Sequence, residues 1–198
     1  MVSTPDQILE FLQSIRRGTH LVLLHENSEY ARGIEFEFLH GGLKKGDHCV
    51  YASMFDEPVE IRERMESFGI DVERYEERNY LRLHKVSIGA PAFNDGGLTW
   101  SEVLSSSTSS SSSLSHYRLV GRLYSPQLMT REHLTECMRI EGQIQKSSSK
   151  WKGITLCSYS MKALKPESIS DWFATILKSH DGVVFAPSPG NGGAFYMR

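Results

Sequence analysis

One stretch of sequence decides the fold class of this chain, Thr19-His20-Leu21-Val22-Leu23-Leu24-His25-Glu26-Asn27. Its four central residues are apolar without polar alternation, which is typical of a strand buried on both faces of a parallel sheet. A helical pattern follows it, so we expect the first strand of an α/β domain. The loop after the strand has no glycine and carries Glu26 and Glu29, whereas loops that bind phosphate at this position are rich in glycine.

Outward from this strand, two kinds of apolar pattern alternate along the chain. Short apolar or alternating runs predict strands at residues 47–53, 80–86, 117–124, 153–160 and 183–186, with a further candidate at 194–197. Amphipathic patterns predict helices at residues 4–17, 28–43, 56–68, 131–146 and from 166 onward. We expect Asp56 to cap the third helix and the charged segment 70–79 to be a surface connection. The alternation predicts an α/β fold with a mostly parallel sheet covered by helices on both faces.

The pattern is interrupted between residues 87 and 116. Residues 105–113 are serines apart from Thr108, and such a tract has no apolar side chain whose burial would offset the entropy lost on ordering. We expect a flexible surface insertion within a single domain that spans residues 1–198. A phosphorylated switch or docking segment is the alternative interpretation.

Composition is that of an ordinary globular protein, with 39% hydrophobic and 23% charged residues among 198. The formal net charge of −2 provides no long-range attraction for nucleic acid or an anionic membrane. No apolar run approaches the roughly 18 residues needed to span a bilayer, and no signal peptide is visible. The three cysteines, Cys49, Cys137 and Cys157, form no CxxC pair. We therefore expect a cytoplasmic protein with buried thiols, no disulfide framework and no zinc site.

Motifs that would indicate a particular chemistry are absent from the sequence. It contains no Walker A loop, no G-x-G-x-x-G, no G-x-S-x-G elbow and no H-E-x-x-H helix. The glycine-rich segment 190–193 follows the last strong strand and is not followed by a helix, so it indicates a turn. We expect no cofactor and no metal. A Ser/Cys-His-acid constellation stays open, because its members need not be close in sequence.

Several polar residues occupy positions where apolar residues are expected. His20 begins the first strand, where we expect a structural hydrogen bond. His25 and Glu26 end it, at the sheet edge where open α/β folds bind ligands. Glu141 lies on the apolar stripe of its helix and needs a partner there. Arg122, at the end of the preceding strand, is an available partner, and the alternative is a role for Glu141 at a pocket.

Three tyrosines also lie near strand ends, where they could line the rim of a pocket. These are Tyr51, Tyr124 and Tyr159, for which a place in the core or on the surface is the alternative. The sequence thus predicts a ligand site built from His25, Glu26, Tyr51, Arg122, Glu141 and Tyr159.

Two sets of residues carry a resemblance to a known family. The first combines Gly18-Thr19-His20 and the apolar strand with Phe38-Leu39-x-x-Gly42-Leu43-x-x-Gly46-Asp47-x-Cys49-x-Tyr51. The second combines Val120-Gly121, Glu141, Thr155-Leu156-Cys157-x-Tyr159 and His180-Asp181-Gly182-Val183-Val184. Over residues 16 to 186, apart from the serine tract, the chain resembles the MEDS domain, a family named from methanogen and methylotroph proteins and a dichloromethane-responsive regulator.

The resemblance implies a RecA/KaiC-like three-layer core that lacks the phosphate loop, and a sensory role. Gly121-Arg122-Leu123 stands where an ATPase of that lineage would hold an acidic residue, which argues against magnesium–nucleotide binding. The leading hypothesis is a non-catalytic sensory domain that binds a small organic ligand or a protein partner. No output domain is visible in the sequence, so we expect the signal to leave through a partner protein or a homo-oligomer. The alternatives are a degenerate ATPase, a hydrolase that uses His25, Glu26 and Glu141, and a pure protein-interaction module.

Overall fold

The computed structural model describes residues 5–87, 98–100, 102–103, 116–122, 131–148, 153–163 and 166–197. The expected serine-rich insertion and Tyr124 lie outside these residues, apart from the short pieces at 98–103. The strands are β1 (His20–His25), β2 (His48–Ser53), β3 (Leu81–Ser87), β4 (Leu98–Thr99), β5 (Tyr117–Arg122), β6 (Ile154–Ser160), β7 (Gly182–Ser188) and β8 (Asn191–Tyr196). The helices are α1 (Pro5–Ser14), α2 (Ser28–Lys44), α3 (Pro58–Ser67), α4 (Val72–Glu77), α6 (Arg131–Ser148) and α7 (Pro166–Ser179), with a short 3₁₀ turn at Met161–Ala163.

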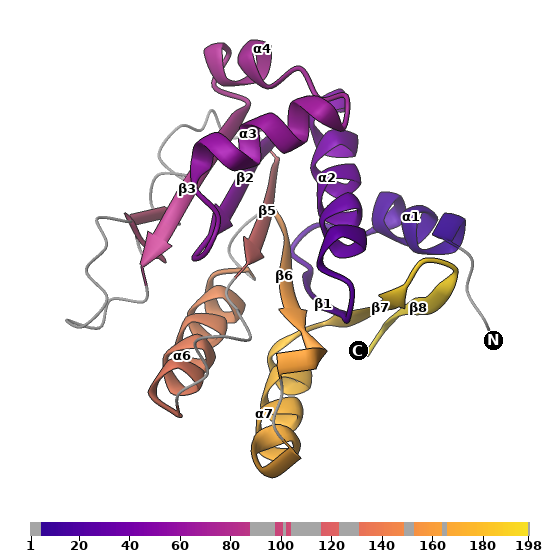
Figure 1. Cartoon of the computed structure of the whole chain (residues 1–198), viewed down its shortest axis with the longest axis vertical. Coiled ribbons are helices and arrows are strands. Elements are labelled where there is room, and N and C mark those ends of the chain that lie inside the picture. Colours follow the sequence, from indigo (N-terminus) through magenta and orange to yellow (C-terminus); the bar gives the residue numbers. More distant parts are fainter. Residues whose placement is uncertain are drawn as a thin grey trace.

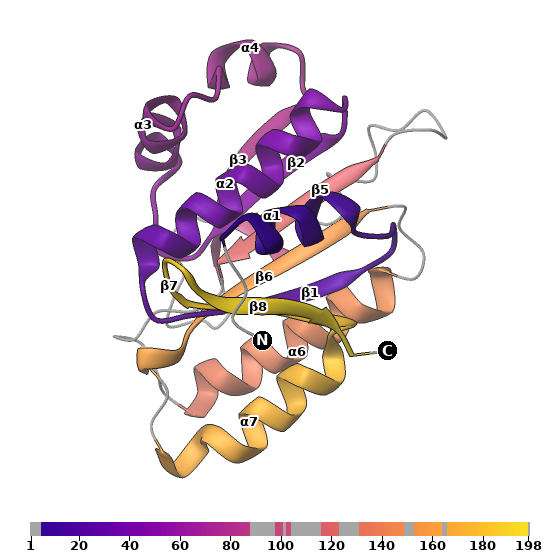
Figure 2. The same ribbon diagram turned by 90° about the vertical axis from the view of Figure 1, so that its right-hand side faces the viewer.

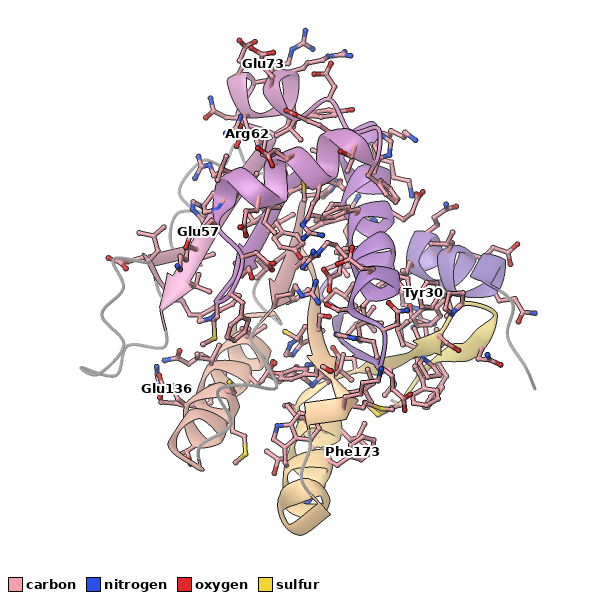
Figure 3. The ribbon with its side chains drawn as sticks, viewed as in Figure 1. Tyr30, Glu57, Arg62, Glu73, Glu136 and Phe173 are labelled. Atoms are coloured by element: carbon pink, nitrogen blue, oxygen red, sulfur yellow. The ribbon has the colours of Figure 1, made fainter. Side chains whose placement is uncertain are left out.

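These strands form one eight-stranded sheet in the order β4-β3-β2-β5-β6-β1-β7-β8. Every pair is parallel except β7 and β8, which form an antiparallel hairpin. Helices α1 and α2 cover one face of the sheet, and α6 and α7 cover the other (Figures 1 and 2). In Figure 3, Arg62 on α3 and Phe173 on α7 lie on opposite sides of the strands. The expected three-layer α/β fold is confirmed.

Strand β1 lies inside the sheet between β6 and β7, and all six of its residues are buried. Because successive side chains of a strand point to opposite faces, Leu21 and Leu23 pack in the core beneath α1 and α2. Val22 and Leu24 pack in the second core beneath α6 and α7. An unbroken apolar run is therefore required here, because both faces of the strand are covered.

Local differences from the expected elements have clear causes. Segment 70–79 contains the helix α4, which the Asp71 side chain caps by accepting a hydrogen bond from the Arg74 amide. The N-cap of α3 is Glu57, not Asp56, because the Asp56 carboxylate is engaged by two other side chains described below. The expected turn at 190–193 is part of the β7–β8 hairpin, where Gly190 has a positive φ of 78°. Within the described ranges, none of the helices has the length and apolar character that crossing a membrane requires.

Candidate functional site

The carboxyl ends of β1, β2 and β5 meet at one edge of the sheet, beside the start of α2. Alternation along the strands places His25, Tyr51 and Arg122 on the face that α2 covers. The register pairs Ser53 with Arg122 and Arg122 with Ser158, so these strand ends are neighbours. Open parallel sheets bind ligands in this position.

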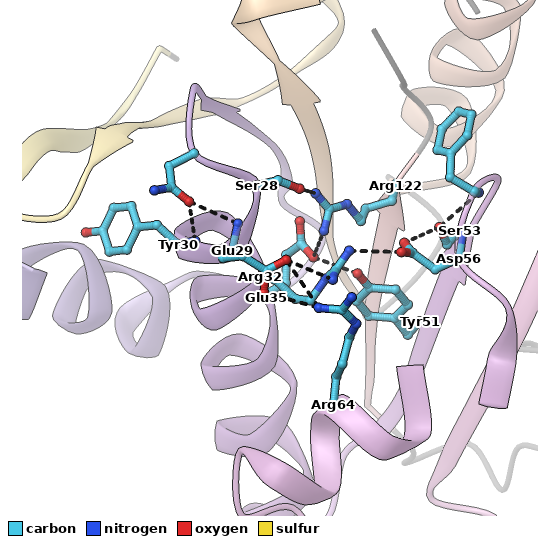
Figure 4. Close-up of polar contacts among 12 residues, drawn as sticks. Ser28, Glu29, Tyr30, Arg32, Glu35, Tyr51, Ser53, Asp56, Arg64 and Arg122 are labelled. Atoms are coloured by element: carbon cyan, nitrogen blue, oxygen red, sulfur yellow. Dashed lines mark hydrogen bonds and ion pairs between the residues drawn. The ribbon is translucent and has the colours of Figure 1, made fainter. Parts of the chain in front are cut away.

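The residues His25, Arg32, Glu35, Tyr51 and Arg122 form a buried polar group that we call the Arg122 cluster. Figure 4 shows the contacts of Arg32, Glu35, Tyr51 and Arg122. The Tyr51 hydroxyl donates to Glu35 Oε2 over 2.7 Å. Arg122 Nη1 lies 3.5 Å from the same oxygen, and Arg122 Nη2 donates to the Ser28 hydroxyl over 2.6 Å. The side chain of Glu35, with no exposed surface, is thus the carboxylate that balances Arg122.

Arg32 links this cluster to the end of β2. Its Nη2 donates to Asp56 Oδ1 over 2.9 Å, and Ser53 donates its hydroxyl to Asp56 Oδ2 over 2.8 Å (Figure 4). Arg32 Nη1 also contacts Glu29, 3.3 Å away, on the preceding turn of α2. The two arginines therefore each have a carboxylate partner, and no positive charge of the cluster is left unbalanced.

Burial and charge fix the protonation states inside the cluster. Burial, together with the positive charges of Arg122 and Arg32, lowers the pKa of His25 to about 3, so its imidazole is neutral at physiological pH. Burial opposes the charge of Arg122, but Glu35, Tyr51 and Asp56 together outweigh it and raise the pKa of Arg122. Burial and Glu35 raise the pKa of Tyr51 well above its usual value, which keeps the phenol a hydrogen-bond donor.

Four buried polar atoms in and beside the cluster have no hydrogen-bond partner within the described residues. They are His25 Nδ1, Arg32 Nε, Glu35 Oε1 and Ser158 Oγ. Leaving such an atom unpaired costs about 1–3 kcal/mol, so these atoms need partners beyond the described residues.

The amino end of α2 is not available as a phosphate cradle. Asn27 Oδ1 accepts hydrogen bonds from the amides of Glu29 and Tyr30, both over 3.0 Å. These are amides of the first helical turn, which in a phosphate-binding helix point at the anion. The Glu29 carboxylate adds negative charge at the same end.

An open groove of about 590 Å³ lies next to the cluster, between α2 and α3. Phe36 and Phe68 give it an apolar wall, and Glu29, Arg32 and Arg64 give it charges. Arg32 belongs to both the groove and the Arg122 cluster. His25, Tyr51 and Arg122 do not line the groove, but the ring of Tyr51 lies 5.9 Å from the ring of Phe36 in its wall.

The remaining predicted site residues lie elsewhere. Glu141 and Tyr159 are buried on the opposite face of the sheet, beneath α6 and α7, and the Tyr159 hydroxyl donates to Glu141 Oε1. Glu26 is exposed in the loop after β1. The predicted Arg122–Glu141 pair is wrong, because the sheet separates the two residues and Glu35 is the partner of Arg122. A hydrolase that uses His25, Glu26 and Glu141 together is excluded by the same separation.

Glu141 belongs to a second buried group, which we call the Glu141 cluster and which consists of His20, Glu141, Cys157 and His180. Glu141 Oε2 lies 3.1 Å from His20 Nε2 and 3.4 Å from His180 Nε2. The imidazole rings of His20 and His180 are 3.9 Å apart between centroids, and Cys157 Sγ lies 3.2 Å from His20 Nε2. Among the described residues, these four offer the set of side chains that could hold a metal ion.

Sequence reasoning missed Arg32 and Glu35 in the Arg122 cluster and Asp56 as a partner of Arg32. It also missed Cys157 and His180 in the Glu141 cluster. A signal existed for Glu35, because Ala31, Glu35 and Leu39 are four residues apart on α2 and all three are fully buried. That is the same reasoning that singled out Glu141. No comparable signal pointed to Cys157, whose neighbours in the cluster come from distant parts of the chain.

Comparisons with known proteins agree with the fold. A KaiC-like protein, PH0186, from the hyperthermophilic archaeon Pyrococcus horikoshii has a structure that matches 85% of this chain and 71% of its own, with a TM-score of 0.63 and 16% identity. A second structure from that organism, PH0250, matches 90% of this chain and 87% of its own, with a TM-score of 0.57 and 9% identity. At these identities the likeness shows the fold alone.

Sequence comparison adds the family. The UPF0273 protein PH0284 of Pyrococcus horikoshii is 43% identical over 47 residues, which span 24% of this chain and 19% of that protein. The MEDS family, described as the methanogen/methylotroph, DcmR sensory domain, matches residues 19–175, from the start of β1 into α7. The chain therefore belongs to the MEDS family, which implies a sensory role.

Proposed function

We propose that this sensory domain binds a small, uncharged, polar organic molecule at the Arg122 cluster, reached from the groove between α2 and α3. The observation that carries the proposal is the set of buried atoms at His25, Arg32, Glu35 and Ser158 that find no hydrogen-bond partner in the described part of the chain. They include both donors and acceptors, which suits a ligand that carries a hydroxyl, carbonyl or amide group.

The charges in the cluster favour an uncharged ligand. Arg122 faces Glu35 and Arg32 faces Asp56, so a charged ligand would disturb two buried ion pairs. The aromatic wall of the groove supplies apolar contact for the hydrocarbon part of such a molecule.

A thermal-shift screen with small neutral organic molecules tests the proposal, because a ligand of the folded state raises the unfolding midpoint. Ser158→Ala removes a hydroxyl that has no hydrogen-bond partner among the residues that the structure describes, so this variant should remain folded and yet bind the screened ligand more weakly. Tyr159→Phe is the matched control, because Tyr159 is the next residue of β6 and faces the opposite core. We expect Ser158→Ala to weaken binding and Tyr159→Phe to leave it unchanged.

Two results would contradict this site. If Tyr159→Phe weakened binding and Ser158→Ala did not, the ligand would lie on the other face of the sheet. If no molecule in the screen raised the midpoint, the domain would instead be a protein-interaction module.

The interaction module is the second candidate, and one observation favours it. Strand β8 is an edge strand with Phe195 and Tyr196 exposed by 55% and 38%, and Phe185 on β7 is exposed by 38%. Aromatic side chains on a sheet edge suit a protein partner or a second copy of the chain. Light scattering across a range of concentrations, with Phe195→Ser as the variant, tests for self-association at this edge.

A further inference from the structure

The Glu141 cluster collects four metal-ligating side chains from four separate elements. His20 begins β1, Cys157 lies within β6, Glu141 is on α6, and His180 follows α7. All four are buried, and one potential ligand atom from each lies within 4.8 Å of every other. Charged and polar groups gathered this closely in a core need a specific partner.

Backbone and side-chain oxygens orient both histidines. His20 Nδ1 lies 3.0 Å from the Ser179 carbonyl oxygen and 3.0 Å from Gln145 Oε1. His180 Nδ1 lies 2.6 Å from the Ile176 carbonyl oxygen. Since these oxygens can only accept, each Nδ1 carries a proton and donates it, and in the neutral form of each ring this leaves a lone pair on Nε2. Metal-binding histidines are typically held in this way.

Those lone pairs face another acceptor. Glu141 Oε2 lies 3.1 Å from His20 Nε2 and 3.4 Å from His180 Nε2, yet neither Glu141 Oε2 nor His180 Nε2 forms a hydrogen bond within the described part of the chain. The Cys157 thiol can donate its one proton to His20 Nε2, 3.2 Å away, which still leaves His180 Nε2 facing the carboxylate. A proton or a metal ion must therefore lie between these acceptors.

We propose that the cluster binds one divalent transition-metal ion, with Zn²⁺ as the best fit, through His20 Nε2, His180 Nε2, Cys157 Sγ and Glu141 Oε2. Two imidazoles, a thiolate and a carboxylate are ligands that zinc takes in a tetrahedron. Ligands about 2.0–2.3 Å from the ion are separated by roughly 3.3–3.8 Å. Three of the pairs here are 3.1, 3.2 and 3.4 Å apart, and all four ligand atoms lie within 4.8 Å of one another. The Tyr159 hydroxyl holds the other carboxylate oxygen and fixes the orientation of Glu141.

Four protein ligands complete a tetrahedral shell, which is typical of a structural site. The ion would join α6 and the end of α7 to the central strands β1 and β6. This site lies on the opposite face of the sheet from the Arg122 cluster, so it does not depend on the proposed ligand.

The test uses the full chain, stripped with a chelator and then titrated with Co²⁺, which reports thiolate coordination by a charge-transfer absorption band. We expect one Co²⁺ per chain, a band of this kind, displacement by Zn²⁺, and a higher unfolding midpoint with Zn²⁺ than without it. Cys157→Ser should abolish the band and weaken binding by more than about tenfold. Cys49→Ser is the matched control, because Cys49 is equally buried but lies in the core on the other face, and it should keep the band.

The proposal can be tested even if a variant fails to fold, because the titration of the wild-type chain measures metal binding directly. If the folded wild-type chain binds no Co²⁺ or Zn²⁺, a proton lies between Glu141 and a histidine, and the two side chains form a buried ion pair. Metal binding that survives both Cys157→Ser and His180→Gln unchanged would place the ion elsewhere. Either result overturns the proposal.

Discussion

At the scale of single residues, two buried carboxylates organise the polar interior of this protein. Glu35 and Glu141 each lie on an apolar stripe of a helix and each receives a tyrosine hydroxyl from a neighbouring strand, Tyr51 and Tyr159 respectively. The carboxylates differ in their other partners, because Glu35 faces an arginine and Glu141 faces two histidines. The first arrangement is an ion pair between Glu35 and Arg122, and the second is the set of side chains that we propose to bind a metal ion.

Removing the charge of Glu35 should destabilise the fold strongly. Glu35→Gln leaves Arg122 buried without its carboxylate, and we expect a loss of about 3–5 kcal/mol in the free energy of unfolding. Glu37→Gln, on an exposed position of the same helix, should change it by less than about 0.5 kcal/mol. Urea unfolding of both variants measures the difference, and similar losses would show that Glu35 does not balance Arg122.

His25 gives the fold a defined pH dependence. Its pKa is about 3 in the folded chain and about 6.5 in the unfolded chain, so the unfolded state binds the additional proton between these values. Stability should therefore fall as the pH falls, with a contribution from His25 of about 2 kcal/mol between pH 7 and pH 5. Urea unfolding of wild type and His25→Gln at both pH values should show a smaller loss for the variant. An NMR titration that gave His25 a pKa near 6.5 would contradict this assignment.

At the scale of elements, the junction of β1 and α2 determines what the sheet edge can bind. The strand delivers His25 to the edge, and Asn27 then caps the helix with its own side chain. The helix places Arg32 and Glu35 one and two turns further along, against the ends of β2 and β5. The amides that could bind phosphate therefore donate to the Asn27 side chain, and the polar groups at this edge of the sheet are side chains.

The contribution of the Asn27 cap to the stability of the fold can be measured. Asn27→Ala removes both hydrogen bonds to the first turn of α2, and we expect it to lower the free energy of unfolding by about 1 kcal/mol. Glu26→Ala changes the adjacent exposed residue and should have an effect below about 0.5 kcal/mol. If the two substitutions had the same effect in thermal or urea unfolding, the capping role of Asn27 would be wrong.

At the scale of the whole molecule, the sheet divides the interior into two cores, each with its own buried polar cluster. The Arg122 cluster lies under α2, near an open groove, and the Glu141 cluster lies under α6 and α7. A mostly parallel sheet makes this division possible, because both of its faces are covered by helices.

The absence of a Walker A loop from the sequence leads to a direct expectation about nucleotide binding. Millimolar Mg-ATP should leave the unfolding midpoint unchanged, because the first-turn amides of α2 are capped and Glu29 stands beside them. A nucleotide present at one hundred times its Kd would stabilise the fold by about 2.7 kcal/mol, which a thermal-shift measurement detects easily. A clear rise of the midpoint would favour the ATPase alternative.

The sequence by itself determined the fold class, most of the helices and strands, and the family. Unbroken apolar runs and amphipathic periods are local properties of the sequence. They predict helices and strands because burial of an element depends little on which elements are its neighbours. Local patterning also identified His25, Arg122 and Glu141 as polar residues in apolar surroundings. It failed for α4, where a six-residue helix depends on the cap at Asp71 more than on an apolar period.

Only the tertiary structure decided which polar residues meet. Arg122 and Glu141 were a reasonable pair along the chain, but strand alternation sends Arg122 to one face of the sheet and α6 brings Glu141 to the other. His20 and His180 are 160 positions apart in sequence, and parallel pairing of β1 with β7 brings them into ring contact. Pairing partners in a parallel sheet are set by the order of the strands, which no local sequence pattern encodes. The sequence supplies the residues of the two clusters, and the order of the strands in the fold brings them together.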